Sequence, residues 1–142
     1  MKPTKLRLDG ILALTDETGM FQHAKFSTID RKEGYTTDDN ARALITTLRY
    51  YNIFKDPESI RLANTYLTFL LHMQRSDGLF NNFLGFDRAF NDDVGSEDCI
   101  GRAIWASGYT LKSDASCERA QKRRALHRFD ASVCCWMHTL KI

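Results

Sequence analysis

The sequence predicts an all-α fold, a partial (α/α) toroid of helical hairpins with long loops at one end. Only two prolines, Pro3 and Pro57, interrupt the chain. Apolar residues recur at intervals of three and four positions over long windows, which indicates amphipathic helices. A loop followed by a helix also occurs twice in similar form. A repeat longer than ~50 residues lies outside the common solenoids and is typical of a toroid of helical hairpins.

The clearest helices cover residues 38–53 and 57–74 and form an αα-hairpin. The segment KDPES between them is a turn. Pro57 suits the first position of the second helix, because the N–H groups of a first turn have no partner within the helix. Each helix has one apolar side at helical spacing. These sides consist of Ala41, Leu44, Ile45, Leu48 and Tyr51 in the first helix, and Ile60, Ala63, Leu67, Leu70 and Leu71 in the second.

Three further helices are predicted around this hairpin, over residues 5–14, 97–112 and 115–140. Two segments between the helices, 18–35 and 76–95, are rich in glycine, aromatic and polar residues. This composition predicts long loops or short hairpins rather than core elements. Because functional residues concentrate on loops that a rigid scaffold positions, we expect function at the end of the molecule where these loops lie.

The two loops and the helices after them form a repeat, with the helices offset by 60 residues. One unit consists of a loop with glycine and an aromatic residue, an Asp-Arg pair, a helix that opens with Ser or Thr, and a return helix. Within the opening of that helix an aspartate precedes an arginine by four positions. The matched residues are Gly19, Phe21, Gln22 and His23 with Gly78, Phe80, Asn81 and Asn82; Asp30 and Arg31 with Asp87 and Arg88; and Thr36, Asp38 and Arg42 with Ser96, Asp98 and Arg102.

The repeat divides the chain into two parts. Residues 1–112 are the predicted N-terminal part of the toroid, with units at about 19–77 and 78–112. Residues 113–142 are basic and cysteine-rich and contain no further loop motif. Since terminal repeats are atypical, we expect this tail to be a C-terminal helix that either caps the repeat or is divergent.

The motifs GYTTDDNARAL, DGLFNNF, FDRAF and GSEDCIGRAIWASGY are similar to those of the six-hairpin glycosidase class, especially its poorly characterised bacterial branch associated with glycosyltransferases. The resemblance covers roughly residues 5–112. It implies an (α/α) toroid, a role in carbohydrate metabolism and no cofactor. The implied partners are carbohydrate, and either a glycosyltransferase or a second copy bound through an exposed toroid flank. The chain has room for fewer helices than a complete toroid, so the resemblance also implies truncation.

Composition excludes several other classes. Twenty basic residues against eighteen acidic ones give a net charge of +2, too small an excess for a nucleic-acid partner. No window approaches the ~18 to 20 apolar residues of a membrane span, and the first residues lack the apolar core of a signal peptide, so a cytoplasmic location is expected. The four cysteines have no CxxC spacing, which predicts free thiols and no metal site.

The acids at the helix starts have two interpretations. Asp38 and Asp98 each precede an arginine, Arg42 and Arg102, by one helical turn, which is the spacing of an intrahelical ion pair. A Thr or Ser just before each acid can cap the helix. Because a structural role is shared between repeats more easily than a catalytic one, we predict that these four residues hold the helix ends.

Asp39 and Glu97 are the candidate catalytic pair. Asp39 corresponds to Cys99 in the repeat and Glu97 to Thr37, so repetition explains neither acid. Glycoside cleavage usually needs two carboxylates, separated by ~5 to 5.5 Å for retention or ~6.5 to 9.5 Å for inversion. The alternative is that both are ordinary exposed acids of a first helical turn.

Sugar binding needs planar polar groups beside flat apolar faces, and the loops contain both. Phe21 and Phe80 are expected to fill the end of the fold. His23 could orient a hydroxyl group or serve as a general base. The candidate substrate-binding residues are His23, Gln22, Asn81, Asn82 and Tyr35.

Two further functions stay open at this point. A non-catalytic helical-repeat module would bind carbohydrate or a protein and would not turn over a sugar. An inactive gene fragment would expose core surface and aggregate.

Overall fold

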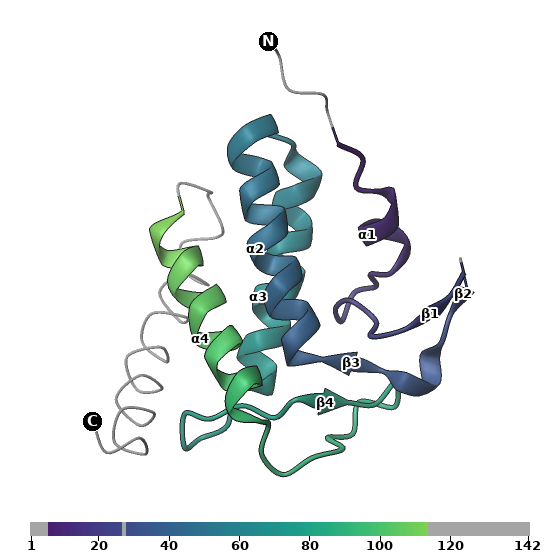
Figure 1. The fold of residues 1–142 in the computed structure, drawn as a ribbon, viewed down its shortest axis with the longest axis vertical. Coiled ribbons are helices and arrows are strands. Elements are labelled where there is room, and N and C mark those ends of the chain that lie inside the picture. The colour runs from purple at the N-terminus through teal and green to yellow at the C-terminus, as the bar shows by residue number, and fades with distance from the viewer. Residues whose placement is uncertain (1–5, 27, 114–142) are drawn as a thin grey trace.

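The computed structural model describes residues 6–26 and 28–113, and all structural statements below concern these residues. The predicted helix at 115–140 lies outside them. Two long helices stand side by side with a third beside them, and short strands and loops gather at one end (Figure 1). The elements are α1 (Asp9–Ala13), β1 (Ala24–Lys25), β2 (Thr28–Ile29), η1 (Arg31–Glu33), β3 (Tyr35–Thr36), α2 (Thr37–Phe54), α3 (Pro57–Met73), β4 (Phe83–Leu84) and α4 (Glu97–Lys112).

The prediction of an all-α fold is wrong, because the structure is mixed. Antiparallel strands β1 and β2 form one small sheet, and β3 and β4 form another. Each strand has only two residues, so none is long enough to show the alternating pattern that reveals strands in a sequence. The long helices of the described part make one hairpin, α2 with α3, and α4 lies beside it, while α1 is a short fourth helix.

The hairpin of α2 and α3 has sharply defined ends. Thr36 caps α2 by accepting a hydrogen bond from the N–H of Asp39, and Lys55 ends the helix in the left-handed conformation at φ 53°. Asp56 caps α3 and Pro57 occupies its first turn, as the sequence predicts. The two-residue connection therefore turns the chain back so that α3 packs along α2.

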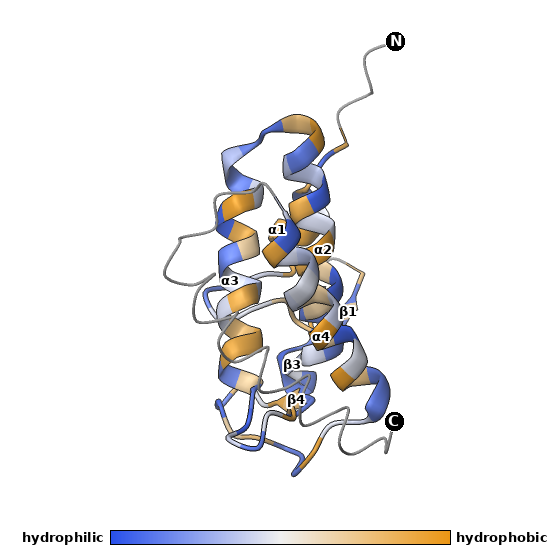
Figure 2. Ribbon diagram, turned by 90° about the vertical axis from the view of Figure 1, so that its left-hand side faces the viewer, coloured by the Kyte–Doolittle hydropathy of each residue, from blue (hydrophilic) through white to orange (hydrophobic). Residues whose placement is uncertain are grey.

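The core lies around α2, which contacts both α3 and α4. Hydrophobic and hydrophilic residues alternate along the helices, and the apolar sides face inward (Figure 2). Each large buried side chain contributes roughly 1.5 to 3 kcal/mol by leaving water. The largest fully buried apolar side chains are Tyr35, Leu44, Leu48, Leu62, Tyr66, Leu67, Phe69, Leu70, Met73 and Leu84.

The β3–β4 sheet joins the loop of the first repeat unit to the loop of the second. Tyr35 pairs with Leu84 and Thr36 with Phe83. Gly34, just before β3, has φ +63°, and a Cβ atom there would collide with the carbonyl oxygen of Leu84. Only glycine allows so close an approach of the two backbones. The pairing thereby brings η1 next to the turn at residues 85–91.

Among the described residues, the helices are too short or too polar for any of them to cross a lipid bilayer.

Candidate functional site

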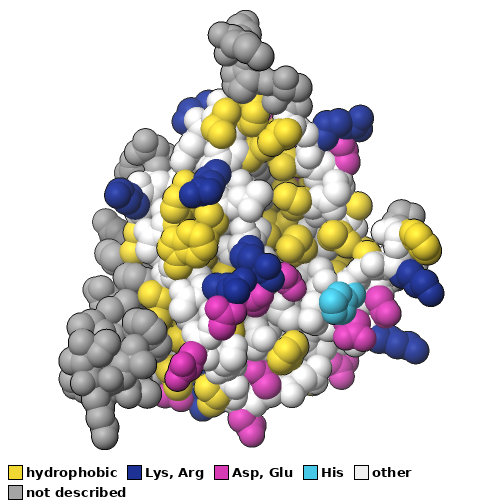
Figure 3. All heavy atoms as spheres, viewed as in Figure 1, with side chains coloured by type: hydrophobic (Ala, Val, Ile, Leu, Met, Phe, Trp, Pro, Cys, Tyr) yellow, Lys and Arg dark blue, Asp and Glu magenta, His cyan; other side chains and the backbone are white. Residues whose placement is uncertain are grey.

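Charged side chains meet where α2 and α4 begin, and we call Asp38, Asp39, Arg42, Asp98 and Arg102 the helix-start cluster. Arg42 pairs with Asp38, one turn away, and with Asp39 at 2.9 Å. Arg102 pairs with Asp98 at 2.8 Å within α4. Acidic and basic groups gather at the middle of the face in Figure 3, as these ion pairs require.

One contact of the helix-start cluster links the two repeat units. Arg102 Nε lies 2.9 Å from Asp38 Oδ1, an ion-pair distance without the alignment of a hydrogen bond. Asp38 therefore has an arginine from each helix beside it, and the starts of α2 and α4 are held together. The sequence predicts the two pairs within the helices, whereas this cross-link depends on how α4 packs on α2.

The candidate catalytic acids occupy the first turns of these adjacent helices. Both carboxylate oxygens of Asp39 have partners, one with Arg42 and the other with the hydroxyl of Thr36, which donates a hydrogen bond of 2.7 Å. Glu97 is exposed and has no ion pair with the described residues. The structure thus places one acid in a network and the other in solvent, and their catalytic roles stay a prediction.

Three of the candidate binding residues hold the fold together. Tyr35 is fully buried, and its hydroxyl donates a 2.6 Å hydrogen bond to Asp16 Oδ2. The buried amide of Asn81 donates to the backbone carbonyls of Asp92 and Asp93. Asn82 accepts a long hydrogen bond of 3.4 Å from the N–H of Asp38 and so helps to cap α2. Tyr35 and Asn81 have little side-chain surface left for a ligand.

The other candidates from the first loop are more accessible. His23 is exposed and Gln22 is half-buried. The backbone N–H of Gln22 donates to the carbonyl of Gly34, which ties this segment to the start of β3. Phe21 is buried and stacks on Tyr35 with ring centroids 4.5 Å apart, and Phe80 is buried as well.

A shallow depression whose lining includes charged and amide side chains lies between η1 and the turn at residues 85–91, and we call it the loop hollow. Its volume is about 410 Å³. Phe86 supplies an aromatic ring that is 47% exposed, and Asp87 and Asn91 supply a carboxylate and an amide. The residues that line the loop hollow are Arg31, Lys32, Gly85, Phe86, Asp87 and Asn91.

Two guanidinium groups flank the Phe86 ring. Arg31 lies 5.7 Å and Arg88 5.8 Å from its centroid, both within cation–π distance. Arg88 also contacts the Tyr35 ring and pairs with Glu17 at 3.4 Å. These contacts place a guanidinium group on each of two sides of the aromatic ring of the loop hollow.

The loop hollow was not among the sites that the sequence predicts, although one signal pointed to it. The Asp-Arg pair occurs in both loops, as Asp30-Arg31 and Asp87-Arg88. What the sequence cannot show is that β3 and β4 pair and so bring the two segments together, since the strands are far apart along the chain.

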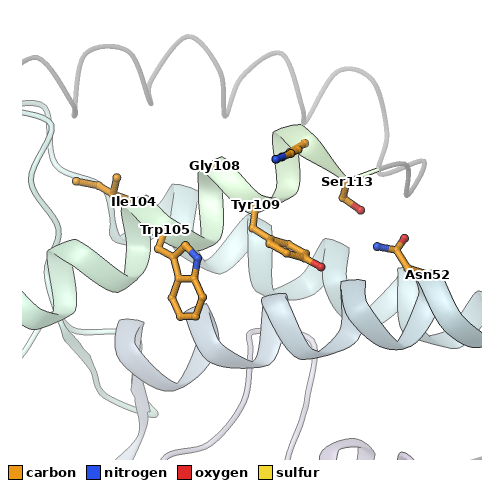
Figure 4. A pocket seen from close by; sticks show the side chains of 7 residues that line it. Asn52, Ile104, Trp105, Gly108, Tyr109 and Ser113 are labelled. Carbon is orange, nitrogen blue, oxygen red and sulfur yellow. The ribbon is translucent and has the colours of Figure 1, made fainter.

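A second groove, of about 650 Å³, runs along α4 and has a different character. Trp105 and Tyr109 project from α4 toward α2, where Asn52 closes one end (Figure 4). Trp105 is 56% exposed, and Arg49 of α2 lies 5.8 Å from the Tyr109 ring centroid. Its lining by described residues contains no carboxylate and one cation, Lys112, so these residues provide few groups for polar recognition.

Cys99 occupies the position in α4 that Asp39 occupies in α2, and it is buried. Burial is the largest cause that raises the pKa of its thiol, to about 12. A thiol with this pKa is protonated at neutral pH and is a poor nucleophile. Within residues 6–26 and 28–113, no three His, Cys, Asp or Glu side chains gather as a metal site would require.

No model of a known protein family matches the chain, and no curated protein matches it significantly.

Proposed function

We propose that the protein binds carbohydrate, with the loop hollow as the binding site. The observation that supports this most is the combination of groups in one depression of about 410 Å³. A half-exposed aromatic ring can contact the apolar face of a sugar, and charged and amide groups around it can bond to hydroxyls. The resemblance of the loop and helix motifs to glycosidases suggests the same class of ligand.

Binding is favoured over turnover by the way the acids are used. Asp39 is engaged with Arg42 and Thr36, and Glu97 is exposed. A glycosidase keeps one of its two carboxylic acids protonated through its surroundings. Among the described residues, Glu97 is exposed and has no apolar enclosure of this kind.

Titration of the purified protein with a panel of oligosaccharides, followed by NMR or calorimetry, tests the proposal. Phe86→Ala should weaken binding by about tenfold, since stacking on an aromatic ring contributes on the order of 1 kcal/mol or more. Phe83→Ala is the matched control, because Phe83 is 40% exposed but does not line the loop hollow. Equal binding by both variants and the wild type would contradict the assignment of the site.

Hydrolysis by Asp39 and Glu97 is a second proposal, based on their positions in the first turns of two helices that Asp38 and Arg102 hold together. This second proposal requires that the protein cleaves the oligosaccharides that bind in the titration. Asp39→Asn and Glu97→Gln should then each abolish product formation, whereas unchanged turnover in both variants would exclude the pair.

A further inference from the structure

We infer that the sugar bound in the loop hollow is a uronic acid, whose carboxylate pairs with Arg31 and Lys32. This inference rests on the proposed function and specifies its ligand. It follows from an asymmetry in how the arginines of the described residues are paired.

Arginines in the described part of the chain are mostly paired with carboxylates. Arg7, Arg42, Arg61, Arg75, Arg88 and Arg102 each form an ion pair. Arg31 and Arg49 form none with the described residues, and both instead contact aromatic rings. Of these two, only Arg31 lines the loop hollow, next to Lys32, which also has no ion pair with the described residues.

The backbone of η1, which carries both cations, is fixed at its two ends. Asp30 caps η1 by accepting the N–H of Lys32 at 3.1 Å, and Gly34 ends the turn in a positive-φ conformation. Phe86 supports the Arg31 guanidinium from the opposite side of the loop hollow. A guanidinium held against a ring still presents its N–H edge, and two parallel N–H groups on one edge match the two oxygens of a carboxylate.

The charge of the loop hollow favours a singly charged ligand. Arg31 and Lys32 are the cations of its lining, and Asp87 is the carboxylate. Asp87 Oδ1 accepts the N–H of Ala89 at 3.1 Å, which fixes the side chain within the turn. A ligand with two negative charges would face repulsion from Asp87, whereas one carboxylate leaves Asp87 and Asn91 free to bond to the hydroxyls of a sugar.

The decisive experiment compares three matched ligands on the full chain at physiological salt. The first is an oligosaccharide that contains glucuronate or galacturonate. The second is the same oligosaccharide with its carboxyl groups reduced to alcohols, and the third is this reduced form carrying sulfate esters. We expect the carboxylated form to bind at least about tenfold more tightly than the reduced form, since a hydrogen-bonded charge pair contributes on the order of 1.5 kcal/mol or more.

Two variants assign this preference to the loop hollow. Arg31→Ala should remove the preference for the carboxylated form, and Arg31→Lys should retain part of it because a charge without the planar fork remains. Arg49→Ala is the matched control. Arg49 of α2 also lacks an ion pair with the described residues, but it contacts the Tyr109 ring of α4 and does not line the loop hollow. This variant should keep the full preference.

The outcomes separate the inference from the proposed function. If the carboxylated and reduced oligosaccharides bound equally well and Phe86→Ala still abolished binding, the assignment of a uronic acid would be overturned and the sugar site would stand. Tighter binding of the sulfated form would overturn the assignment of a carboxylate ligand. An equal loss of affinity for the carboxylated form in Arg31→Ala and Arg49→Ala would overturn the site, because it would indicate unspecific charge attraction. If none of the oligosaccharides bound, the proposed function itself would fail.

Discussion

The helix-start cluster and the loop hollow are neighbouring charged regions that use their charges differently. In the helix-start cluster every arginine has a carboxylate partner, and Asp38 has two arginines. In the loop hollow, Arg31 and Lys32 have no ion pair with the described residues. Charges that satisfy one another hold elements together, whereas cations left without a counter-ion are available to a ligand. The difference supports the proposal that the first region stabilises the fold and the second binds a ligand.

The repeat supports the same distinction. The Asp-Arg pairs of the helix-start cluster occur in both units and at the same spacing in α2 and α4. The loop hollow instead lies between the two units, with η1 from the first on one side and the 85–91 turn from the second on the other. A unique site formed between repeats is better suited to a specific ligand than a motif that each repeat contains.

The largest effect is expected at Gly34, which connects the two regions. Gly34→Ala places a Cβ against the Leu84 carbonyl at a backbone conformation of φ +63°. We expect a loss of at least about 2 kcal/mol in the free energy of unfolding, because strain of this kind costs ~1 to 3 kcal/mol before the collision is counted. Denaturant unfolding followed by circular dichroism measures it.

Gly101→Ala is the control for Gly34→Ala. A Cβ at Gly101 would have no atom within 4 Å beyond the backbone of its own helix, α4. Alanine is favoured over glycine inside a helix by up to about 1 kcal/mol, so this variant should be neutral or more stable. Similar destabilisation by both substitutions would show that Gly34 has no special role.

The next largest difference is expected between the two N-caps, Thr36 of α2 and Ser96 of α4, in their contributions to the free energy of unfolding. Thr36 is buried, accepts the N–H of Asp39 at 3.1 Å and donates to its carboxylate. Ser96 is exposed and accepts the N–H of Cys99 at 3.3 Å. We expect Thr36→Ala to cost about 1 to 2 kcal/mol and Ser96→Ala about 0.5 kcal/mol, within the known range for N-caps. Thermal unfolding of both variants tests the order, and a larger loss for Ser96→Ala would reverse it.

A smaller difference in stability is expected between two acids of the helix-start cluster, Asp38 and Asp98. Asp38 contacts both arginines and its side chain is 23% exposed, whereas the side chain of Asp98 is 71% exposed and contacts only Arg102. Asp38→Asn should cost about 1 kcal/mol and Asp98→Asn less than about 0.5 kcal/mol, because exposed ion pairs contribute little. Raising the salt concentration should reduce the difference, and equal costs would contradict a role of Asp38 in joining the helices.

The smallest effect on stability at neutral pH is expected from the ionisation of the Cys99 thiol. Burial raises the pKa of its thiol to about 12, above that of the unfolded chain. The neutral thiol therefore stabilises the fold fully below about pH 8.5, the pKa of a free cysteine, and this contribution declines as the pH rises toward 12. At pH 8 we expect iodoacetamide to modify Cys99 only after unfolding, as peptide mass spectrometry would show. Rapid modification in the folded protein would contradict its burial.

The three long helices of the described part could be predicted well from the sequence because their signals are local, whereas the helix expected at 5–14 is only the five-residue α1. The expected helix at 97–112 coincides with α4, and Pro57 begins α3 as predicted. The strands could not be predicted, because β3 and β4 are two residues long and their pairing depends on contacts distant in the chain.

The candidate site was predictable only in part, for a related reason. The residue types of Tyr35 and Asn81 suit sugar binding, but packing turns both side chains inward. The ion pairs within α2 and α4 follow from spacing alone. The loop hollow arises from the contact of η1 with the 85–91 turn, and no single segment contains that information.

One measurement tests the central claim, that the helix-start cluster stabilises the fold and the loop hollow binds the ligand. Arg102→Ala and Arg31→Ala are compared in stability, by denaturant unfolding, and in affinity for uronate oligosaccharides, by calorimetry. We expect Arg102→Ala to lose about 1 kcal/mol of stability and to bind as the wild type does, and Arg31→Ala to stay within ~0.5 kcal/mol of the wild type and lose its preference for uronate. The reverse result, with Arg31 needed for stability and Arg102 for binding, would contradict the account.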